Sequence, residues 1–234
     1  MKATEFEFRN RSLINLIHLW ISFQVYSFDR VNVVWAFVPW NTPRGQFVAR
    51  LIFGFGAILI GLAAAIRTWA AAYLRSEVVH DSDLHADNLV ADGPYRHVRN
   101  PLYLGTFLLS VGLAFLASRI GAAILVVGAA LRILRLIGRE EADLGKQQGA
   151  TYGEFGRRVP RLLPSLLARV PASGLAPQWG QAFRGEAPMW GFFIMMTAFA
   201  VTLNDDVAGT LAGATLLVWL FQRITERVRS RERA

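Results

Sequence analysis

The stretch from residue 93 to residue 105, GPYRHVRNPLYLG, brings together several side chains that can recognise a polar ligand. It holds two arginines, a histidine, an asparagine and two tyrosines, and it runs directly into an apolar segment. Pro94 and Pro101 fix their own φ and disfavour helix in the residue before them, so we expect residues 92 to 100 to form ordered, non-helical backbone. The stretch therefore offers backbone N–H and C=O groups, with cationic and aromatic side chains, to a ligand at a membrane surface.

A second polar cluster lies further along the chain, between residues 132 and 152, and includes Glu140 and Glu141. The apolar segments 102–117 and 120–137 separate the two clusters and are joined only by Ser118 and Arg119. So short a link forces an antiparallel helical hairpin, which returns the chain to the same membrane face. The two clusters must therefore meet in space, and their carboxylates, arginines and aromatic rings suit a zwitterionic ligand with a flat ring.

Composition places the chain among integral membrane proteins. Of its 234 residues, 53% are hydrophobic, and they form long uncharged runs. The net charge of +8 comes from arginines between these runs and after the last one, which is the pattern of a membrane protein and not of a nucleic-acid-binding protein. The sequence has no cysteine, which excludes disulfides and thiolate chemistry, and the spacing of His80, His85 and His97 does not predict a metal site.

The apolar runs predict an all-α membrane bundle of about six transmembrane helices, within a range of five to seven. Segment 31–40 is too short and too broken by proline to span, and we expect it to be interfacial or re-entrant. The predicted spans are residues 13–28, 47–74, 102–117, 120–137, 188–203 and 207–221. Segment 138–187 reads as a soluble cap, helical over residues 140–155 with a break near Gly149. The organisation predicted is N-terminal membrane helices (1–75), a ligand-binding core (76–165), and a linker with a C-terminal hairpin and basic tail (166–234).

Arginine counting sets the expected orientation. The arginines of segments 75–100 and 138–187 and of the basic tail fall on one side of the membrane, which the positive-inside rule makes the cytoplasmic side. We therefore expect both termini and the polar clusters in the cytoplasm, with the lipid bilayer as the main partner. Glycines 54, 56 and 61 are expected to allow close helix contact, and Asp205 and Asp206 to form a turn between two helices.

A longer pattern of residues runs through both clusters. In chain order it is Gly93, Tyr95, Arg99, Pro101, Tyr103, Gly105, then the hairpin, then Glu140, Glu141, Leu144, Gly149, Tyr152, Phe155, Val159 and Pro160. Over residues 78 to 164 this pattern resembles the isoprenylcysteine carboxyl methyltransferase family and its phospholipid methyltransferase relatives. The resemblance implies an S-adenosylmethionine-dependent membrane methyltransferase with a lipid-like acceptor, such as a prenylated cysteine carboxylate or a phospholipid amine. Transfer of a methyl group from a sulfonium needs positioning and desolvation more than acid or base.

The resemblance also implies roles for particular residues. Arg99, Glu140, Arg135 and Arg139 would form the reaction centre, with Arg135 or Arg139 nearest the polar head of the acceptor. The cofactor contacts would fall on His80, Asp87, Asn88, Leu89, Val90, Tyr95, Asn100, Pro101, Leu102, Tyr103, Glu140 and Glu141. Two positions depart from the family pattern, since Asn100 stands where a histidine is usual and Asp87 where the best-known members have histidine. Two other hypotheses stay open: an NADPH-dependent membrane reductase of the sterol reductase type, and a non-catalytic membrane module with this fold.

Overall fold

The structure, a computed structural model, describes residues 2–74 and 91–232, with side chains described through Thr225. In this part of the chain every regular element is a helix, and the sole β-bridge joins Asn32 to Ser118. The α-helices are α1 (Glu5–Arg9), α2 (Arg11–Gln24), α3 (Pro43–Tyr73), α5 (Pro101–Ala114), α6 (Arg119–Gln148), α7 (Ala150–Arg158), α8 (Trp179–Gly185), α9 (Ala187–Thr202) and α10 (Asp205–Glu232); the 3-10 helices are η1 (Val25–Ser27) and η2 (Gly93–Arg96). The prediction of an all-α helical bundle is confirmed.

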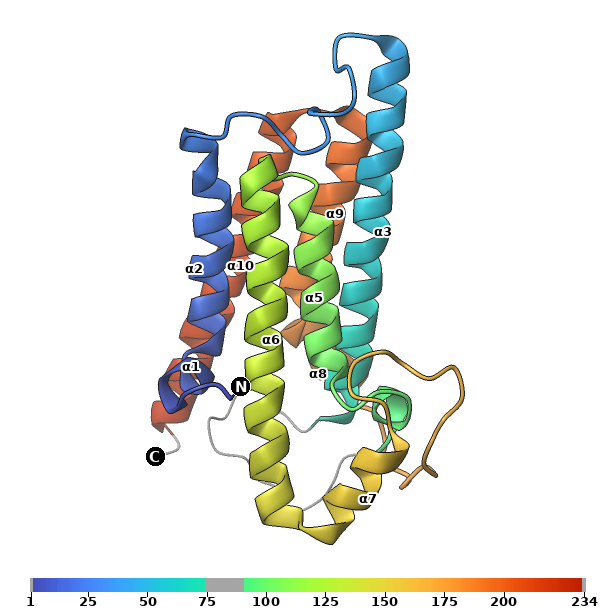
Figure 1. Cartoon of the computed structure of the whole chain (residues 1–234). Helices are drawn as coiled ribbons and strands as arrows, with labels where there is room; N and C mark the ends of the chain where they lie inside the picture. Colours follow the sequence, from blue (N-terminus) through green and yellow to red (C-terminus); the bar gives the residue numbers. More distant parts are fainter. Residues whose placement is uncertain (1, 75–90, 233–234) are drawn as a thin grey trace.

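Helices α2, α3, α5, α6, α9 and α10 lie along a common direction and form the body of the bundle (Figure 1). The α5–α6 hairpin lies between α2 on one side and α3 on the other, and α9 and α10 lie behind it (Figure 1). At one end α6 extends well beyond α5 and leads into α7, and α1 and α8 lie at this same end (Figure 1). We call this the α7 end, and we call the opposite end, where residues 28–42 cross from α2 to α3, the loop end.

Length and hydropathy identify three of the described helices as candidate membrane spans. They are α3, α6 and the Asp205–Thr225 part of α10, with mean hydropathy of 2.2, 2.2 and 1.4 in their most apolar windows. Helices α5 and α9 are apolar but only 14 and 16 residues long, and α2 has 14 residues. All six predicted spans are therefore helices, and half of them are long enough to cross a bilayer by themselves. As expected, residues 31–40 form turns and no long helix.

Two helix boundaries show how local sequence shaped the fold. Helix α6 continues through Gly138 to Gln148, eleven residues past the end of the predicted span at residue 137. A single glycine costs a helix only about 1 kcal/mol, and the residues after it are strong helix formers. The predicted break at Gly149 is confirmed, because this residue has a φ of +54°, which only glycine adopts easily. The break turns α7 away from the axis of α6.

The core is densest where α3 packs on α5 and α9. A Cβ atom added to Gly112 would lie 2.5 Å from Ile60 Cγ1 and 2.8 Å from the Gly56 carbonyl oxygen, so α3 and α5 touch through glycine. Phe53, Ile60 and Met196 are fully buried at this junction. The expected role in close packing is confirmed for Gly56 but wrong for Gly54, whose added Cβ would meet nothing within 4 Å.

Candidate functional site

The residues before α5, which we call the motif loop (residues 91–100), have a fixed backbone at the α7 end. Gly93 has a φ of +56°, and a Cβ atom there would lie 2.3 Å from the ring of Tyr73, so both conformation and space require glycine. Pro94 is the buried second residue of the short 3-10 helix η2, and Pro101 begins α5. Residues 92–100 are ordered and form no α-helix, as predicted, but the expectation of non-helical backbone is wrong for residues 93–96, which form the 3-10 helix η2.

A second segment, which we call the strap (residues 159–175), runs along the motif loop and fixes it by backbone hydrogen bonds. The amide of Arg99 donates to Pro160 O (2.8 Å), and the amide of Ser165 donates to His97 O (2.9 Å). Asp92 is buried and accepts the amides of Ser173 (2.8 Å) and Leu175 (3.0 Å). The strap therefore holds the motif loop in one conformation.

The electrostatics of Asp92 follow from these contacts. Burial alone would raise its pKa, but hydrogen bonds from the hydroxyl of Ser173 and from the amides of Leu175, Ser173 and Gly174 outweigh that effect. The pKa of Asp92 is therefore lowered from its usual value, and the carboxylate is charged in the folded protein.

Two cationic candidates in the motif loop are used to bind the strap. Arg96 Nε donates to Val170 O (2.9 Å), and His97 Nδ1 lies 2.9 Å from Ser165 O, which can only accept. From the sequence, both side chains were candidates for binding a polar ligand. Their contacts instead give them a structural role in closing the strap over the loop.

Glu141 lies between two arginines. Its Oε1 atom is 3.1 Å from Arg99 NH1, and its Oε2 atom is 2.9 Å from Arg161 NH2 of the strap. Asn100 donates to the same carboxylate at 3.3 Å and to Arg161 O at 3.0 Å. Burial and the charge of Glu141 raise the pKa of the Tyr152 phenol, which contacts Arg99, to about 12. This cluster joins the motif loop, α6, α7 and the strap through charges that satisfy one another.

Glu140, the preceding residue of α6, points to a different environment. Its carboxylate hydrogen-bonds with the phenol of Tyr103 in the first turn of α5. Burial, and then the negative charge of Glu140, raise the pKa of the Tyr95 phenol well above its usual value. Within the described part of the chain no arginine or lysine lies within ion-pair distance of Glu140, in contrast to Glu141. Glu140 is therefore a carboxylate that lies near two phenols and forms no ion pair with a described residue, although the charge of Arg11 acts on it from a greater distance.

A buried ion pair lies below this region and connects three helices. Arg67 of α3 forms two contacts with Glu186, at 2.7 Å and 2.8 Å, and its NH1 atom donates to Leu102 O (3.1 Å) and to the Thr106 hydroxyl (2.9 Å). The Glu186 side chain is only 5% exposed. Because a buried charge needs a partner, this pair fixes the start of α5 against α3 and α9.

Of the α6 arginines Arg132, Arg135 and Arg139, two pair with the N-terminal helix α1. Arg135 pairs with Glu7 of α1 (2.8 Å), and Arg139 pairs with Glu5. Arg132 differs, because its Nε and NH1 atoms are buried without a hydrogen-bond partner among the described residues. The two arginines expected nearest an acceptor are thus occupied by α1 carboxylates, and the one without such a partner is Arg132.

Only some of the remaining residues that we expected to contact the cofactor belong to the part of the chain that the structure describes. His80 and residues 87–90, that is Asp87, Asn88, Leu89 and Val90, lie outside the described residues. Pro101 is buried, and the Leu102 carbonyl already accepts from Arg67. The structure thus brings Tyr95, Asn100, Tyr103, Glu140 and Glu141 together from the two sequence clusters, as the hairpin predicted.

Sequence reasoning missed three partners of the predicted residues: Glu186, which pairs with Arg67, and Glu5 and Glu7, which pair with Arg139 and Arg135. A signal was present for the two glutamates of α1. Thr4 followed by Glu7 is a capping-box pattern, and the structure forms it, with Thr4 N donating to Glu7 Oε2 at 2.6 Å. No local signal marks Glu186 as the partner of Arg67.

Comparison with known proteins shows what the segment that carries these residues is similar to. A sequence model of the phospholipid methyltransferase family matches residues 50–150. The cobalt-zinc-cadmium resistance protein CzcN of Cupriavidus metallidurans is 27% identical over 143 residues, which are 61% of each chain. The nickel-cobalt-cadmium resistance protein NccN of Alcaligenes xylosoxydans xylosoxydans is 30% identical over 121 residues, 51% of this chain and 53% of that protein.

A third relative is similar over a shorter stretch. Methanethiol S-methyltransferase 2 of Bradyrhizobium diazoefficiens is 43% identical over 75 residues, 32% of this chain and 28% of that enzyme. The chain spans about half the length of the first two relatives and less of the third. No solved structure matches the chain. The matched segment includes most of α3, the motif loop, the α5–α6 hairpin and both glutamates, and over this segment the chain is similar to the phospholipid methyltransferase family, as the motif predicted.

Proposed function

We propose that this chain is an S-adenosylmethionine-dependent membrane methyltransferase whose donor binds at the α7 end, between the motif loop, the first turn of α5 and Glu140. The observation that carries the proposal is the contrast between adjacent glutamates. Glu141 is neutralised by Arg99 and Arg161, whereas Glu140 has no cation within ion-pair distance among the described residues. A partly buried carboxylate without a positive partner is expected to bind a cationic group.

The described residues fit the polar groups of this donor. Glu140 would bind the ammonium group, and Tyr95 and Tyr103 would close the same space with their rings. Both N–H groups of the Asn100 amide are used by Glu141 and Arg161. Its carbonyl oxygen has no hydrogen bond among the described residues, so Asn100 would accept one from the donor. A histidine at this position could donate from a charged ring, whereas Asn100 cannot.

The bound donor would supply a methyl group on a positively charged sulfur. The chain's own contribution is then to hold that group and to exclude water from it. The strap and the Glu141 cluster serve the first task, because they fix the motif loop before any ligand binds. The first turn of α5, held by the Arg67–Glu186 pair, serves the second task by closing the site toward the membrane.

An anionic group of the methyl acceptor would bind at Arg132. Arg135 and Arg139, which the sequence favoured, would first have to leave Glu7 and Glu5. Arg132 needs no such exchange, because two of its buried nitrogen atoms lack partners among the described residues. Similarity to the phospholipid methyltransferase family favours a lipid-like acid or amine as acceptor, and the relative named as a methanethiol S-methyltransferase favours a thiolate. An arginine between α2 and α6 suits the carboxylate and the thiolate better than the amine.

Ligand binding to the detergent-purified protein tests the proposal. Calorimetric titration with S-adenosylhomocysteine should show binding to the wild type and at least about a thirtyfold loss of affinity in Glu140→Gln. Glu154→Gln is the matched control, because Glu154 lies on α7 with its side chain 57% exposed. Titration with NADPH runs in parallel. Binding of NADPH alone would establish the reductase, and binding of neither ligand would favour the non-catalytic module.

The acceptor requires a separate experiment. Membrane extracts are incubated with the protein and with donor labelled in the methyl group, and the products are separated into lipid, protein and volatile fractions. Label in the lipid or protein fraction would identify a lipid-like acceptor, whereas label in the volatile fraction would identify a small thiol. If Arg132 binds an anionic acceptor, Arg132→Gln should lower labelling in any fraction without changing the affinity for S-adenosylhomocysteine.

A further inference from the structure

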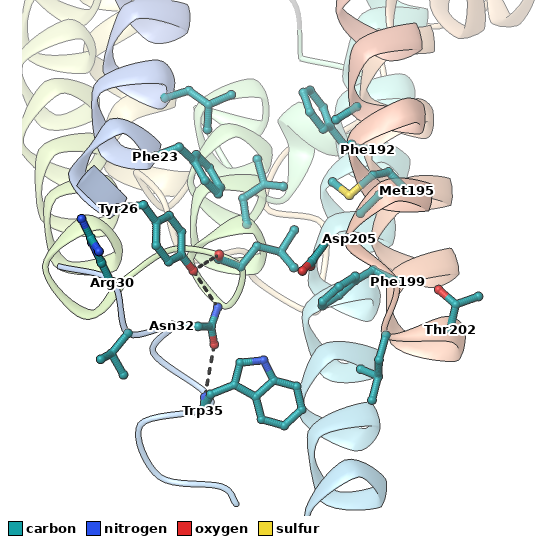
Figure 2. Close-up of a pocket in the computed structure, with 18 of the residues that line it drawn as sticks. Phe23, Tyr26, Arg30, Asn32, Trp35, Phe192, Met195, Phe199, Thr202 and Asp205 are labelled. Carbon is teal, nitrogen blue, oxygen red and sulfur yellow. Dashed lines mark hydrogen bonds between the residues drawn. The ribbon is translucent and has the colours of Figure 1, made fainter. Parts of the chain in front are cut away.

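A large cavity lies at the loop end of the bundle, away from Glu140. Its volume is about 1130 Å³, slightly above the range of about 300–1,000 Å³ that is usual for small-molecule sites. It is lined by residues of α2, η1, the first turns of α3, the end of α5, α9, α10 and the crossing segment 28–42. Figure 2 shows side chains from α2, α9 and the crossing segment pointing into it. None of the residues predicted from the methyltransferase motif lines this cavity.

The cavity exists because α2 and α10 do not close on each other. Only 6% of the apolar window of α10 is buried, compared with 39% for α3 and for α6. Ala208, Gly209 and Ala212 line the α10 side, and their small side chains leave room against Leu16 and Leu19 of α2. A Cβ atom added to Gly209 would meet nothing within 4 Å, so packing does not explain this glycine.

The shape of the cavity suits hydrocarbon chains of one leaflet. Its lining on α2 and η1 runs from Leu16 to Tyr26, which at 1.5 Å per residue is roughly 15 Å. That length is about half of the hydrocarbon thickness of a bilayer. The inner walls are aromatic and aliphatic, formed by Phe23, Leu113, Phe192, Met195 and Phe199.

The rim of the cavity carries charges that the protein does not neutralise. Arg30 and Arg50 lie there, and neither forms a salt bridge within the described part of the chain. Asp205 lies on the opposite side, likewise without a described ion-pair partner, so the rim carries a net positive charge. Nearby Arg119, in contrast, pairs with Asp29 at 2.9 Å.

The inner polar groups of the cavity are satisfied by the protein itself. The Tyr26 hydroxyl donates to Leu116 O (2.7 Å), and Asn32 donates to Tyr26 (3.0 Å) and to Phe115 O (3.0 Å), as Figure 2 shows in part. A ligand therefore meets apolar walls inside and uncompensated arginines at the mouth. This arrangement matches an amphiphile with hydrocarbon chains and an anionic head.

We propose that the cavity is a binding site for a glycerophospholipid of the leaflet at the loop end. Its acyl chains lie between α2 and α10, and its phosphate lies at Arg30 and Arg50. This site is separate from the proposed methyl-transfer site and does not depend on it, because Glu140 and the motif loop lie at the α7 end.

Native mass spectrometry of the full-length protein in detergent tests the proposal with three probes: dioleoyl phosphatidylglycerol, dioleoylglycerol and inorganic phosphate. We expect the phospholipid to be retained, dioleoylglycerol to be retained at least about tenfold more weakly, and phosphate not to compete. The double variant Arg30→Gln with Arg50→Gln should lower the affinity for the phospholipid by about tenfold. Arg44→Gln, an exposed arginine of α3 outside the cavity, should have no effect.

A pair of glycine variants separates the cavity from the lipid-facing surface of α10. Gly209→Leu places a side chain in the cavity, whereas Gly213→Leu places the same side chain outside its lining, and both positions have open space around the added Cβ. Both changes favour helix, so folding is expected in each case. Loss of the phospholipid in Gly209→Leu alone supports the proposal. Equal loss in both variants, loss in neither, or displacement of the lipid by phosphate would overturn it.

Discussion

Glu141 lies between two arginines at one end of the bundle, whereas its neighbour Glu140 forms no ion pair with a described residue. At the other end Asp29 pairs with Arg119, while Arg30 and Arg50 have no described partner. Each end thus ties some charges together inside the protein and leaves others open. The open carboxylate of Glu140 lies at the α7 end, whereas at the loop end the two open guanidinium groups outnumber the open carboxylate of Asp205.

The two ends also differ in how firmly the open charge is held. At the α7 end the strap donates and accepts backbone hydrogen bonds along the motif loop, and the Glu141 cluster fixes the neighbouring side chains. At the loop end Arg30 is an exposed side chain beside a cavity that α10 covers loosely. The first arrangement suits a small ligand that needs precise orientation, and the second suits a lipid whose chains provide most of the affinity.

Removing one partner of the buried pair Arg67–Glu186 should have the largest effect. Glu186→Ala leaves Arg67 without its partner, and we expect a loss of about 3 kcal/mol in the free energy of unfolding, measured by denaturation in detergent. The double variant Arg67→Met with Glu186→Leu should be closer to the wild type, because it leaves no isolated charge. A single variant as stable as the wild type would show that this pair does not hold the α7 end.

Replacing a charged residue by glutamine should lower the free energy of unfolding more at the α7 end than at the loop end. Glu141→Gln takes the counter-charge from Arg99 and Arg161, and Arg99 is only 16% exposed, so we expect a loss of about 2 kcal/mol in unfolding free energy. Arg30→Gln at the loop end should change it by less than about 0.5 kcal/mol, because Arg30 is exposed and forms no described ion pair. Equal losses in the same unfolding measurement would remove the distinction between the two ends.

The attachment of the strap should depend on pH through Asp92. The folded pKa of Asp92 is lowered, so below about pH 4 the unfolded or detached state binds more protons than the folded state. The Asp92 carboxylate thus stabilises the attached strap fully above the ordinary aspartate pKa, and this stabilisation is lost as the pH falls through the pKa of Asp92 in the folded protein. Hydrogen exchange should show residues 173–175 protected at neutral pH and released in acid.

The variant Asp92→Ala should release these amides at neutral pH, at a cost of about 1–2 kcal/mol in the free energy of local opening. The matched control is Asp206→Ala, since Asp206 is exposed in the first turn of α10. Protection that stays unchanged in Asp92→Ala would mean that backbone contacts alone hold the strap.

Features that depend on local sequence were predictable. The short link between two apolar segments predicted the α5–α6 hairpin, although the link comprises residues 115–118 and Arg119 already belongs to α6. The hairpin in turn brought Asn100 to Glu141. Gly149 marked a break because the backbone there needs a positive φ. In each case a short stretch of sequence carries the whole physical cause.

The sequence did not predict which residue each charged side chain contacts in the folded protein. Arg67 and Glu186 are 119 positions apart, and nothing near either residue indicates the other. Arg96 and His97 looked available for a ligand, yet their contacts are with strap carbonyls that the sequence does not place nearby. The same limit applied to the α6 arginines, whose partners Glu5 and Glu7 lie at the other end of the sequence.

The pair Glu7–Arg135 gives the smallest predicted effect, because both side chains are about one-third exposed, at 34% and 29%. Hydrogen bonds from Arg135 and from the Thr4 amide lower the pKa of Glu7 to about 2, so the contribution of this pair is complete above about pH 4.5 and is lost as pH falls toward 2. We expect Glu7→Gln to lower the hydrogen-exchange protection of α1 amides by about threefold at neutral pH and to remove this acid dependence. Glu5→Gln should leave the acid dependence in place. If Glu7→Gln also strengthens binding of an anionic acceptor, Arg135 competes with Arg132 for that role, and the α7 end has two open arginines.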